Sequence, residues 1–156
     1  MDVLYYWKDL AADVKAGRLG WFRSSKDKFA EFKDSYPGYI WLFKTPKGEK
    51  GRLQLLARVV WSDAPTTPVS ASPREHLIHY QVNHSKSVWY EDSGSEEAVE
   101  QVSAWVRTHF PAALRANYQG ANGQLALRGR VLQELNTIAA RLKATPFGAR
   151  IVPPSE

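Results

Sequence analysis

Short hydrophobic runs bounded by turn-forming residues alternate with amphipathic stretches along the first half of the chain. Helical spacing of apolar residues in 8–18, where Leu10 and Val14 are four apart, and in 25–35 predicts two short helices. Gly17 is placed to end the first of them. Runs rich in β-branched and aromatic residues predict strands at 3–7, 20–24, 39–44, 52–62, 75–82 and 87–90.

The clearest of these patterns is the pair of runs at 39–44 and 52–62, which flank a glycine-bearing turn at 46–51. Two strands around such a turn predict a β-hairpin. Neither run alternates cleanly between apolar and polar residues, so we expect both of its faces to be covered, as in a small closed sheet or barrel. The Pro-, Ser- and Thr-rich stretch at 63–73 predicts a loop or an extended connection.

Helical periodicity dominates the second half of the chain. Residues 95–110 place valines at helical spacing and two glutamates in the first turn, where the helix dipole favours them. Pro111 follows, and 112–118 predicts one or two further helical turns. The longest predicted helix is 123–145, which Pro146 ends, and its apolar residues recur three, four or seven apart: Leu125, Leu132, Leu135, Ile138 and Leu142.

This order of elements predicts one domain over residues 1–156 with an α+β fold. Strands and helices mix without a βαβ rhythm, which favours a small, curved, mainly antiparallel sheet or barrel flanked by helices. A helical part is expected at about 95–145. The length of 156 residues and the hydrophobic content of 44% suit one domain with a proper core.

The charge of the chain favours an anionic partner. The formal net charge is +5 and the sequence pI is about 9.5. Basic residues outnumber acidic ones up to residue 60 and after residue 110, and acidic residues prevail between them. A functional basic face and an ordinary solubilising surface both account for this distribution.

The composition also excludes several classes of protein. Without cysteine there is no disulfide framework, thiolate catalysis or cysteine-ligated zinc. The start of the chain lacks a basic and then apolar leader, and no apolar run approaches the ~20 residues of a membrane helix. We therefore expect a cytoplasmic protein with no membrane segment.

Patterns for catalysis or metal binding are weak. His76 and His79 are three apart on a predicted strand, so their side chains point to opposite faces. No nucleophile elbow, P-loop or dinucleotide fingerprint occurs. We expect no metal, no cofactor and no catalysis. A small hydrolase or nuclease built on His84 and Glu91 stays open as the last of three alternatives.

Aromatic residues make up 12% of the chain and include six tryptophans. Trp41 and Trp105 lie in apolar patterns and are predicted to be in the core. The other four lie near strand ends beside polar residues, where either plain packing or an open ring face is possible: Trp7, Trp21, Trp61 and Trp89. Stacking on such rings suits nucleobases, and nearby basic residues suit phosphates, here Arg23, Lys26, Lys28 and Lys44.

The stretch from Trp21 to Asp63 resembles the EVE domain, a member of the PUA-like superfamily and a relative of the YTH readers of methylated adenine. The family has a W-x-G-V-R-N segment, a short helix, a turn, a hydrophobic strand, a glycine-bearing turn and a strand that ends before aspartate. The corresponding pieces are "GWFRSS", "KDKFAEFKDSYPG", "YIWLFK", "PKGEKG" and "RLQLLARVVWSD". "YYWKD" takes the place of the family's opening strand, without its "KSEP" signature.

The resemblance implies a strongly curved barrel whose pocket opens where the first strand, the 20–24 segment and the end of the 39–44 strand meet. By position, Trp21 would stack on or wall in a base, and the polar residues after it would offer hydrogen bonds or phosphate contacts. Lys44 would flank the opening. The base-binding residues carried over in this way are Trp7, Trp21, Arg23, Ser24, Ser25, Lys26 and Lys44.

The leading functional hypothesis is therefore a non-enzymatic nucleic-acid-binding module. It would hold a base, plain or modified, of RNA or DNA in an aromatic pocket with a basic rim. The main alternative is a protein-interaction or assembly module that docks its partner through the helix at 123–145. An exposed apolar patch on that helix would favour this alternative.

Overall fold

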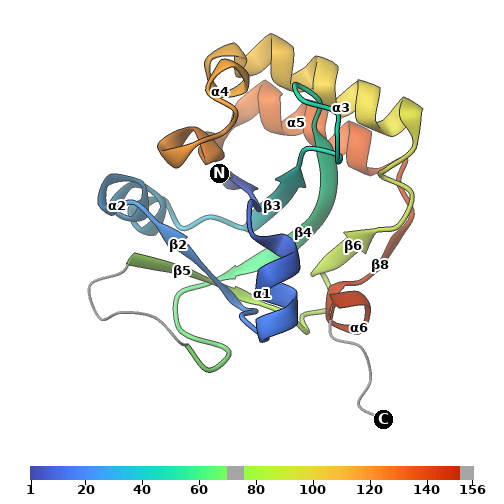
Figure 1. Cartoon of the computed structure of the whole chain (residues 1–156). Coiled ribbons are helices and arrows are strands. Elements are labelled where there is room, and N and C mark those ends of the chain that lie inside the picture. The colour runs from blue at the N-terminus through green and yellow to red at the C-terminus, as the bar shows by residue number, and fades with distance from the viewer. Residues whose placement is uncertain (70–75, 152–156) are drawn as a thin grey trace.

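The computed structural model of the chain describes residues 1–69 and 76–151 (Figure 1). It is an α+β fold in which one curled, mixed sheet forms a half-barrel with helices around it. The strands are β1 Asp2–Tyr6, β2 Trp21–Ser24, β3 Tyr39–Lys44, β4 Gln54–Ser62, β5 His76–Gln81, β6 Val88–Tyr90, β7 Gln124–Leu127 and β8 Ala144–Pro146. The helices are α1 Leu10–Ala16, α2 Lys26–Ser35, α3 Glu96–His109, α4 Pro111–Arg115, the 3-10 helix η1 Gly120–Gly123, α5 Gly129–Ala139 and α6 Phe147–Ile151.

The first strand, β1, lies inside the sheet between β3 and β7. The strand order is β2-β5-β4-β3-β1-β7, while β6 pairs with β4, and β8 pairs with β6. The β1–β3 pair is parallel and the other pairs are antiparallel. The predicted α+β class and the curved, mainly antiparallel sheet are confirmed. The six predicted strands are present with small shifts of their ends.

Strand β3 is buried on both faces, as its unbroken apolar run predicts. Trp41 and Phe43 contribute to a cluster that also contains residues of α3 and α5. Ile40 and Leu42, which point to the opposite face, contribute to a second cluster on the other side of the sheet. All four side chains are completely buried. The sheet therefore separates two hydrophobic cores, and β3 belongs to both.

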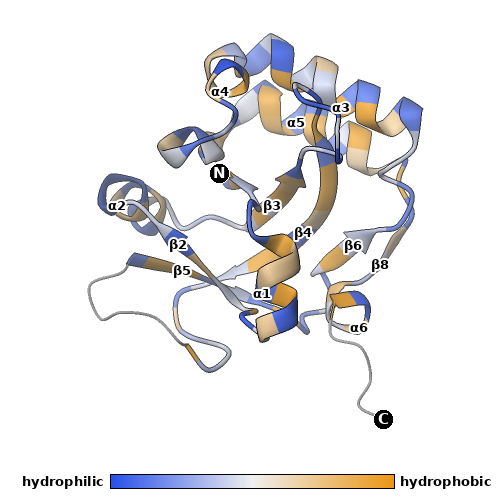
Figure 2. Ribbon diagram, in the orientation of Figure 1, coloured by the Kyte–Doolittle hydropathy of each residue, from blue (hydrophilic) through white to orange (hydrophobic). Residues whose placement is uncertain are grey.

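Helices α3 and α5 pack together over one of these cores, where apolar and polar positions alternate around each helix (Figure 2). Ser95 caps α3, because its side chain accepts a hydrogen bond from the Ala98 N–H at 3.1 Å. Trp105 is buried and donates its Nε1–H to the Val131 carbonyl at 3.0 Å. The prediction that Trp41 and Trp105 belong to the core is confirmed.

The single long helix predicted over 123–145 is wrong. Residues 124–127 form β7, which pairs with β1, and 144–146 form β8, which pairs with β6; only Gly129–Ala139 is helical. Gly129 has a left-handed backbone with φ +55°, so the chain turns at this residue, where α5 begins. The apolar spacing that suggested one helix also fits a strand, because Leu125 and Leu127 are two residues apart.

Side chains bridge β2 and β7, the two ends of the main strand order. Ser24 Oγ and Gln124 Oε1 are 2.6 Å apart, and Gln124 Nε2 donates to the Arg23 carbonyl at 3.5 Å. Beside them the ring of Tyr5 stacks on Phe22 with centroids 4.1 Å apart. The curl of the sheet thus brings the 20–24 segment next to β1, although the two strands do not share a ladder.

The predicted loop at 63–73 is described only in part. Residues 63–69 contain no helix or strand, and 70–73 lie outside the described residues. Within the part of the chain that is described, no helix combines the length and the apolar character needed to cross a membrane.

Candidate nucleic-acid interface

Three adjoining depressions follow the end of β1, from the β3–β4 turn past residues 117–124 to the 20–24 segment. The first, about 450 Å³, is formed by the β3–β4 turn together with Tyr6, Asn117 and Tyr118. Those three residues also line the second, about 590 Å³, which extends to Tyr5, Lys8 and Asp9. The third, about 70 Å³, shares these last three residues with the second, so the three depressions are neighbours on the surface. We call the three depressions together the tyrosine groove.

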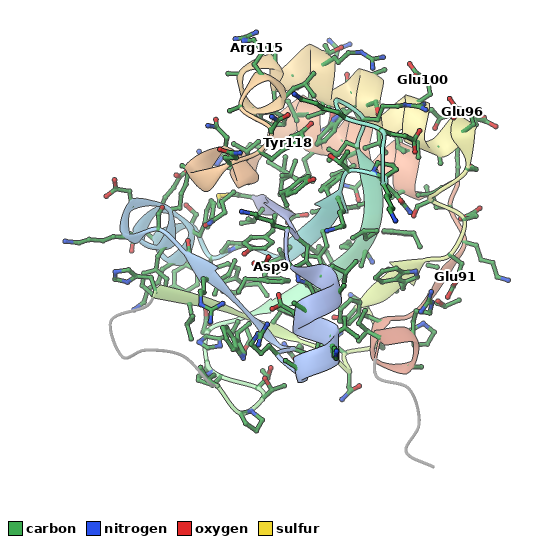
Figure 3. All side chains as sticks on the ribbon, in the orientation of Figure 1. Asp9, Glu91, Glu96, Glu100, Arg115 and Tyr118 are labelled. Atoms are coloured by element: carbon green, nitrogen blue, oxygen red, sulfur yellow. The ribbon has the colours of Figure 1, made fainter. Side chains whose placement is uncertain are left out.

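The middle of the tyrosine groove is built on a pair of stacked tyrosines. The rings of Tyr6 and Tyr118 are nearly parallel, with centroids 4.9 Å apart and planes 5° apart. Tyr118 is buried and its pKa is raised by burial, whereas Tyr6 is half-buried and its hydroxyl accepts a hydrogen bond from the Thr45 N–H at 3.1 Å. Figure 3 labels Tyr118 and Asp9, which line the groove from its upper and lower sides in that view.

The backbone is strained where it presents Tyr118. Asn117 and Tyr118 both have left-handed backbones, with φ of +52° and +56°. Such conformations cost about 1–3 kcal/mol each for residues other than glycine. A Cβ atom at Gly123 would lie 2.5 Å from the Tyr118 carbonyl oxygen, so only glycine fits there. The surrounding structure therefore holds Tyr118 in place against its backbone preference.

Positive charge prevails along the tyrosine groove. Lys8, Lys47 and Lys50 line it and are exposed, and within the described residues their side chains have no ion pair or hydrogen bond. Lys44 Nζ donates to the carbonyl oxygens of Trp7 and Lys8, at 3.4 and 2.9 Å, so it fixes the backbone that carries Lys8.

The acidic residues of the groove are partly neutralised. Asp13 accepts hydrogen bonds from Arg18 Nε at 3.0 Å and from Trp7 Nε1 at 2.9 Å. Glu49 pairs with Arg52 at 3.1 Å. This leaves the exposed carboxylate of Asp9 beside the lysines. The tyrosine groove therefore has tyrosines in its walls and mainly positive charge on its rim.

The predicted site residues fall at the narrow end of the groove. Trp7, Trp21 and Arg23 line the smallest of the three depressions. The rings of Trp7 and Trp21 are only 1% and 4% exposed, so neither presents a free face for stacking. The guanidinium of Arg23 lies over the ring of Trp21, 5.3 Å from its centroid. Trp21 Nε1 is buried and has no hydrogen-bond partner in the part of the chain that the structure describes.

The other predicted residues make contacts within the protein or lie apart from the groove. Ser24 contacts Gln124, as described above, and Ser25 caps α2 by accepting a hydrogen bond from the Lys28 N–H at 3.2 Å. Lys26 is exposed in the first turn of α2 and lines none of the three depressions. Sequence patterns missed the tyrosine pair and Asn117, because Tyr6 and Tyr118 meet only in the folded chain.

The residues considered for catalysis or metal binding have separate surroundings. His84 Nδ1 accepts a hydrogen bond from the Lys86 N–H at 3.0 Å, whereas Glu91 contacts Thr145 at 2.7 Å and Arg150 at 3.6 Å. Among residues 1–69 and 76–151, no group of three or more histidine and carboxylate side chains is arranged to hold a metal ion.

The side of α5 proposed to dock a partner packs into the protein. Leu135 and Ala139 are buried in the core beneath α3, and Val131, Leu132 and Ile138 pack partly against it. Within the described residues, the large hydrophobic side chains that are exposed are Tyr36 and Val69, and neither belongs to α5. The patch that would favour a protein-docking helix is therefore not found on α5.

His79 makes the stability of the fold sensitive to mild acid. Burial lowers its pKa below the ordinary 6.5, so the unfolded chain takes up a proton at higher pH than the folded chain does. We expect the free energy of unfolding to fall as the pH drops below about 6.5. The pKa of Glu96 is also lowered, by Arg52, so its contribution is lost only below about 4.5.

Urea titrations at pH 7 and pH 5.5 test this expectation. The unfolding midpoint of the unmodified chain should drop between the two pH values, and that of His79→Gln should drop less. Equal drops in the two proteins would assign the sensitivity to other groups.

No family model, curated protein or solved structure matches this chain. Its function is therefore inferred from the residues of the groove.

Proposed function

We propose that this chain is a non-enzymatic nucleic-acid-binding module of PUA-like fold that binds through the tyrosine groove. The observation that carries the proposal is the series of adjoining depressions, with tyrosines in their walls and three exposed lysines on their rim that have no ion pair among residues 1–69 and 76–151. The curled half-barrel flanked by helices is compatible with the EVE-like architecture suggested by the pieces between Trp21 and Asp63.

Phosphate attraction supplies most of the affinity in this proposal. Lys8, Lys47 and Lys50 would neutralise successive phosphates and release their counterions. Arg23 would extend the cationic rim toward the narrow end of the groove. Lys44 acts indirectly, because its ammonium group already bonds to two backbone carbonyls beside Lys8.

The groove walls suit unpaired bases. Tyr5 and Tyr6 are half-buried, so part of each ring is accessible for contact with a base. The amide side chains of Asn117, Gln119 and Gln124 line the middle depression and can donate to or accept from base edges. A plain or modified base presented in a single strand would fit the middle depression, whose volume is in the range of ligand sites. Trp7 and Trp21 would support this surface from below.

Oligonucleotide titrations at two salt concentrations test the proposal. We expect single-stranded RNA or DNA to bind, and the affinity to fall roughly 10- to 100-fold between about 50 mM and about 200 mM salt, as for three to five phosphate contacts. Fluorescence anisotropy with labelled single strands and duplexes measures this. Absence of binding at the lower salt concentration, or binding that does not change with salt, would refute the proposal.

A further inference from the structure

A second pocket lies outside the tyrosine groove, between α2 and the adjoining ends of β4 and β5. Its volume is about 310 Å³. Its walls include Phe29, Tyr36, Trp61, Asp63, Leu77 and His79, none of which lines the groove. We call it the Trp61 pocket. Figure 1 shows α2 lying beside β2 and β5 in this part of the fold.

Tyr36 lines the Trp61 pocket and has a strained backbone. It follows α2 with a left-handed backbone, φ +46°, where glycine or asparagine is the usual residue. Its side chain is 75% exposed, so burial in the core does not repay the strain. Strained backbones of this kind cluster at ligand sites, so Tyr36 directs attention to a ligand at this pocket.

Two more aromatic rings, those of Trp61 and Phe29, line the pocket together with Tyr36. Trp61 is half-buried, and its Nε1 donates to Asp63 Oδ1 at 3.3 Å, which orients the indole beside a carboxylate. Phe29, on α2, forms another wall. The ammonium nitrogen of Lys33 lies 5.6 Å from the Phe29 ring centroid, so one of the three rings already makes a cation–π contact.

The charges of the Trp61 pocket favour a further cation. Asp63 is exposed and has no ion-pair partner among the residues that the structure describes. His79 forms part of the floor, and its lowered pKa keeps the imidazole neutral at pH 7, so it adds no repulsion. The side chain of Leu77 adds an apolar wall, which suits methyl groups. Lys33 is the one positively charged residue among those that line the pocket, and its flexible side chain can move away from a bound cation.

The geometry points to the Trp61 pocket as a binding site for a methylated ammonium group, held between Tyr36, Trp61 and Phe29 with Asp63 as its counter-charge. Aromatic rings around a carboxylate are the surroundings in which quaternary ammonium groups are recognised. The group could belong to a free small molecule such as choline or to a methylated lysine in a peptide. This inference does not depend on nucleic-acid binding.

Calorimetric titration with tetramethylammonium and choline tests the site. The neutral carbon isostere of choline, 3,3-dimethylbutan-1-ol, is the matched control ligand. We expect the two cations to bind and the isostere to bind at least about 5-fold more weakly, because cation–π attraction and Asp63 act only on charge. Equal affinities for choline and its isostere, or no binding of either cation, would overturn the inference.

Four variants locate the site. Tyr36→Gly removes a ring and relieves the left-handed strain, so it should weaken choline binding about 3- to 30-fold without lowering the thermal midpoint. Asp63→Asn should weaken binding, and Lys33→Gln should strengthen it, each about 2- to 10-fold. Trp89→Leu changes another half-buried tryptophan, outside the pocket, and should leave the affinity unchanged. Choline affinity that survives Tyr36→Gly, or that falls in Lys33→Gln, would contradict the assignment.

A trimethyl-lysine peptide and its unmethylated form separate the two sources of the group. Preference for the methylated peptide over choline assigns the site to proteins, and the reverse preference assigns it to free small molecules; either result supports the methylammonium site. Oligonucleotide binding measured on Tyr36→Gly should equal that of the unmodified chain, so failure of this site leaves the tyrosine groove testable by itself.

Discussion

Replacing Lys8, Lys47 and Lys50 together by glutamate is expected to weaken single-stranded nucleic-acid binding by about 100-fold or more near 0.1 M salt. Each lysine that contacts a phosphate of a single strand contributes roughly fivefold at this salt concentration through counterion release. The slope of log affinity against log salt should become shallower by about two, as expected for three lost contacts on a single strand. Anisotropy titrations over a series of salt concentrations measure both quantities.

The matched control carries the same change of charge elsewhere. Lys86, Arg141 and Lys143 are exposed and do not line the groove, so Lys86→Glu, Arg141→Glu and Lys143→Glu in one chain should reduce affinity only slightly. Both triple variants should keep the unfolding midpoint of the unmodified chain, because surface substitutions of this kind change stability little. Equal losses of affinity in the two triple variants would show that net charge, and not the groove, attracts the nucleic acid.

Trp41→Ala is expected to lower the free energy of unfolding by about 3–5 kcal/mol. The Trp41 side chain is completely buried, and its Nε1 donates to the buried carboxylate of Asp2 at 2.8 Å. Removing the indole leaves a cavity between the sheet and α3. It also removes one of the two hydrogen-bond donors that compensate the burial of the Asp2 carboxylate; the other donor is the Tyr39 N–H at 3.2 Å. Such a loss is a large part of the stability of an ordinary domain.

Urea unfolding followed by far-UV circular dichroism measures this loss. Trp41→Phe keeps most of the apolar volume and removes only the donor to Asp2, so it should cost less than Trp41→Ala. Trp89→Ala truncates a half-buried tryptophan and should also cost less. A loss in Trp41→Ala that does not exceed the loss in Trp89→Ala would mean that Trp41 is not a central part of the core.

The local pattern of apolar and polar residues was sufficient to predict the β3–β4 hairpin, but it was not sufficient to predict the elements of the last third of the chain. The run at 39–44 lacks alternation because Trp41 and Phe43 serve one core and Ile40 and Leu42 the other. Within 124–127, by contrast, the choice between helix and strand is made by β1, which offers an unpaired edge to these residues. That edge belongs to the other end of the chain, so no periodicity within 123–145 could show it.

The candidate groove was predictable only in part. The EVE-like order of elements suggested a pocket where β1, the 20–24 segment and the end of β3 meet. The smallest depression is lined by residues of the 20–24 segment, whereas the two larger ones are lined mainly by the β3–β4 turn and by residues 117–124. Trp21 stood out because polar residues surround it in sequence, yet its ring is covered in the fold. Tyr118 lies in a stretch with no distinctive pattern, and its role depends on a stacking contact with Tyr6.

The placement of β1 between β3 and β7 also has a consequence for synthesis on the ribosome. Its first ladder, to Ile40 and its neighbours, can form early, whereas its second awaits residues 124–127. Until these residues emerge, the growing chain carries an open strand edge on β1, which is then the last strand of its row, and such an edge is the kind of surface that chaperones shield. We therefore expect the domain to complete its folding only late in translation, and fragments that end before Gln124 to aggregate.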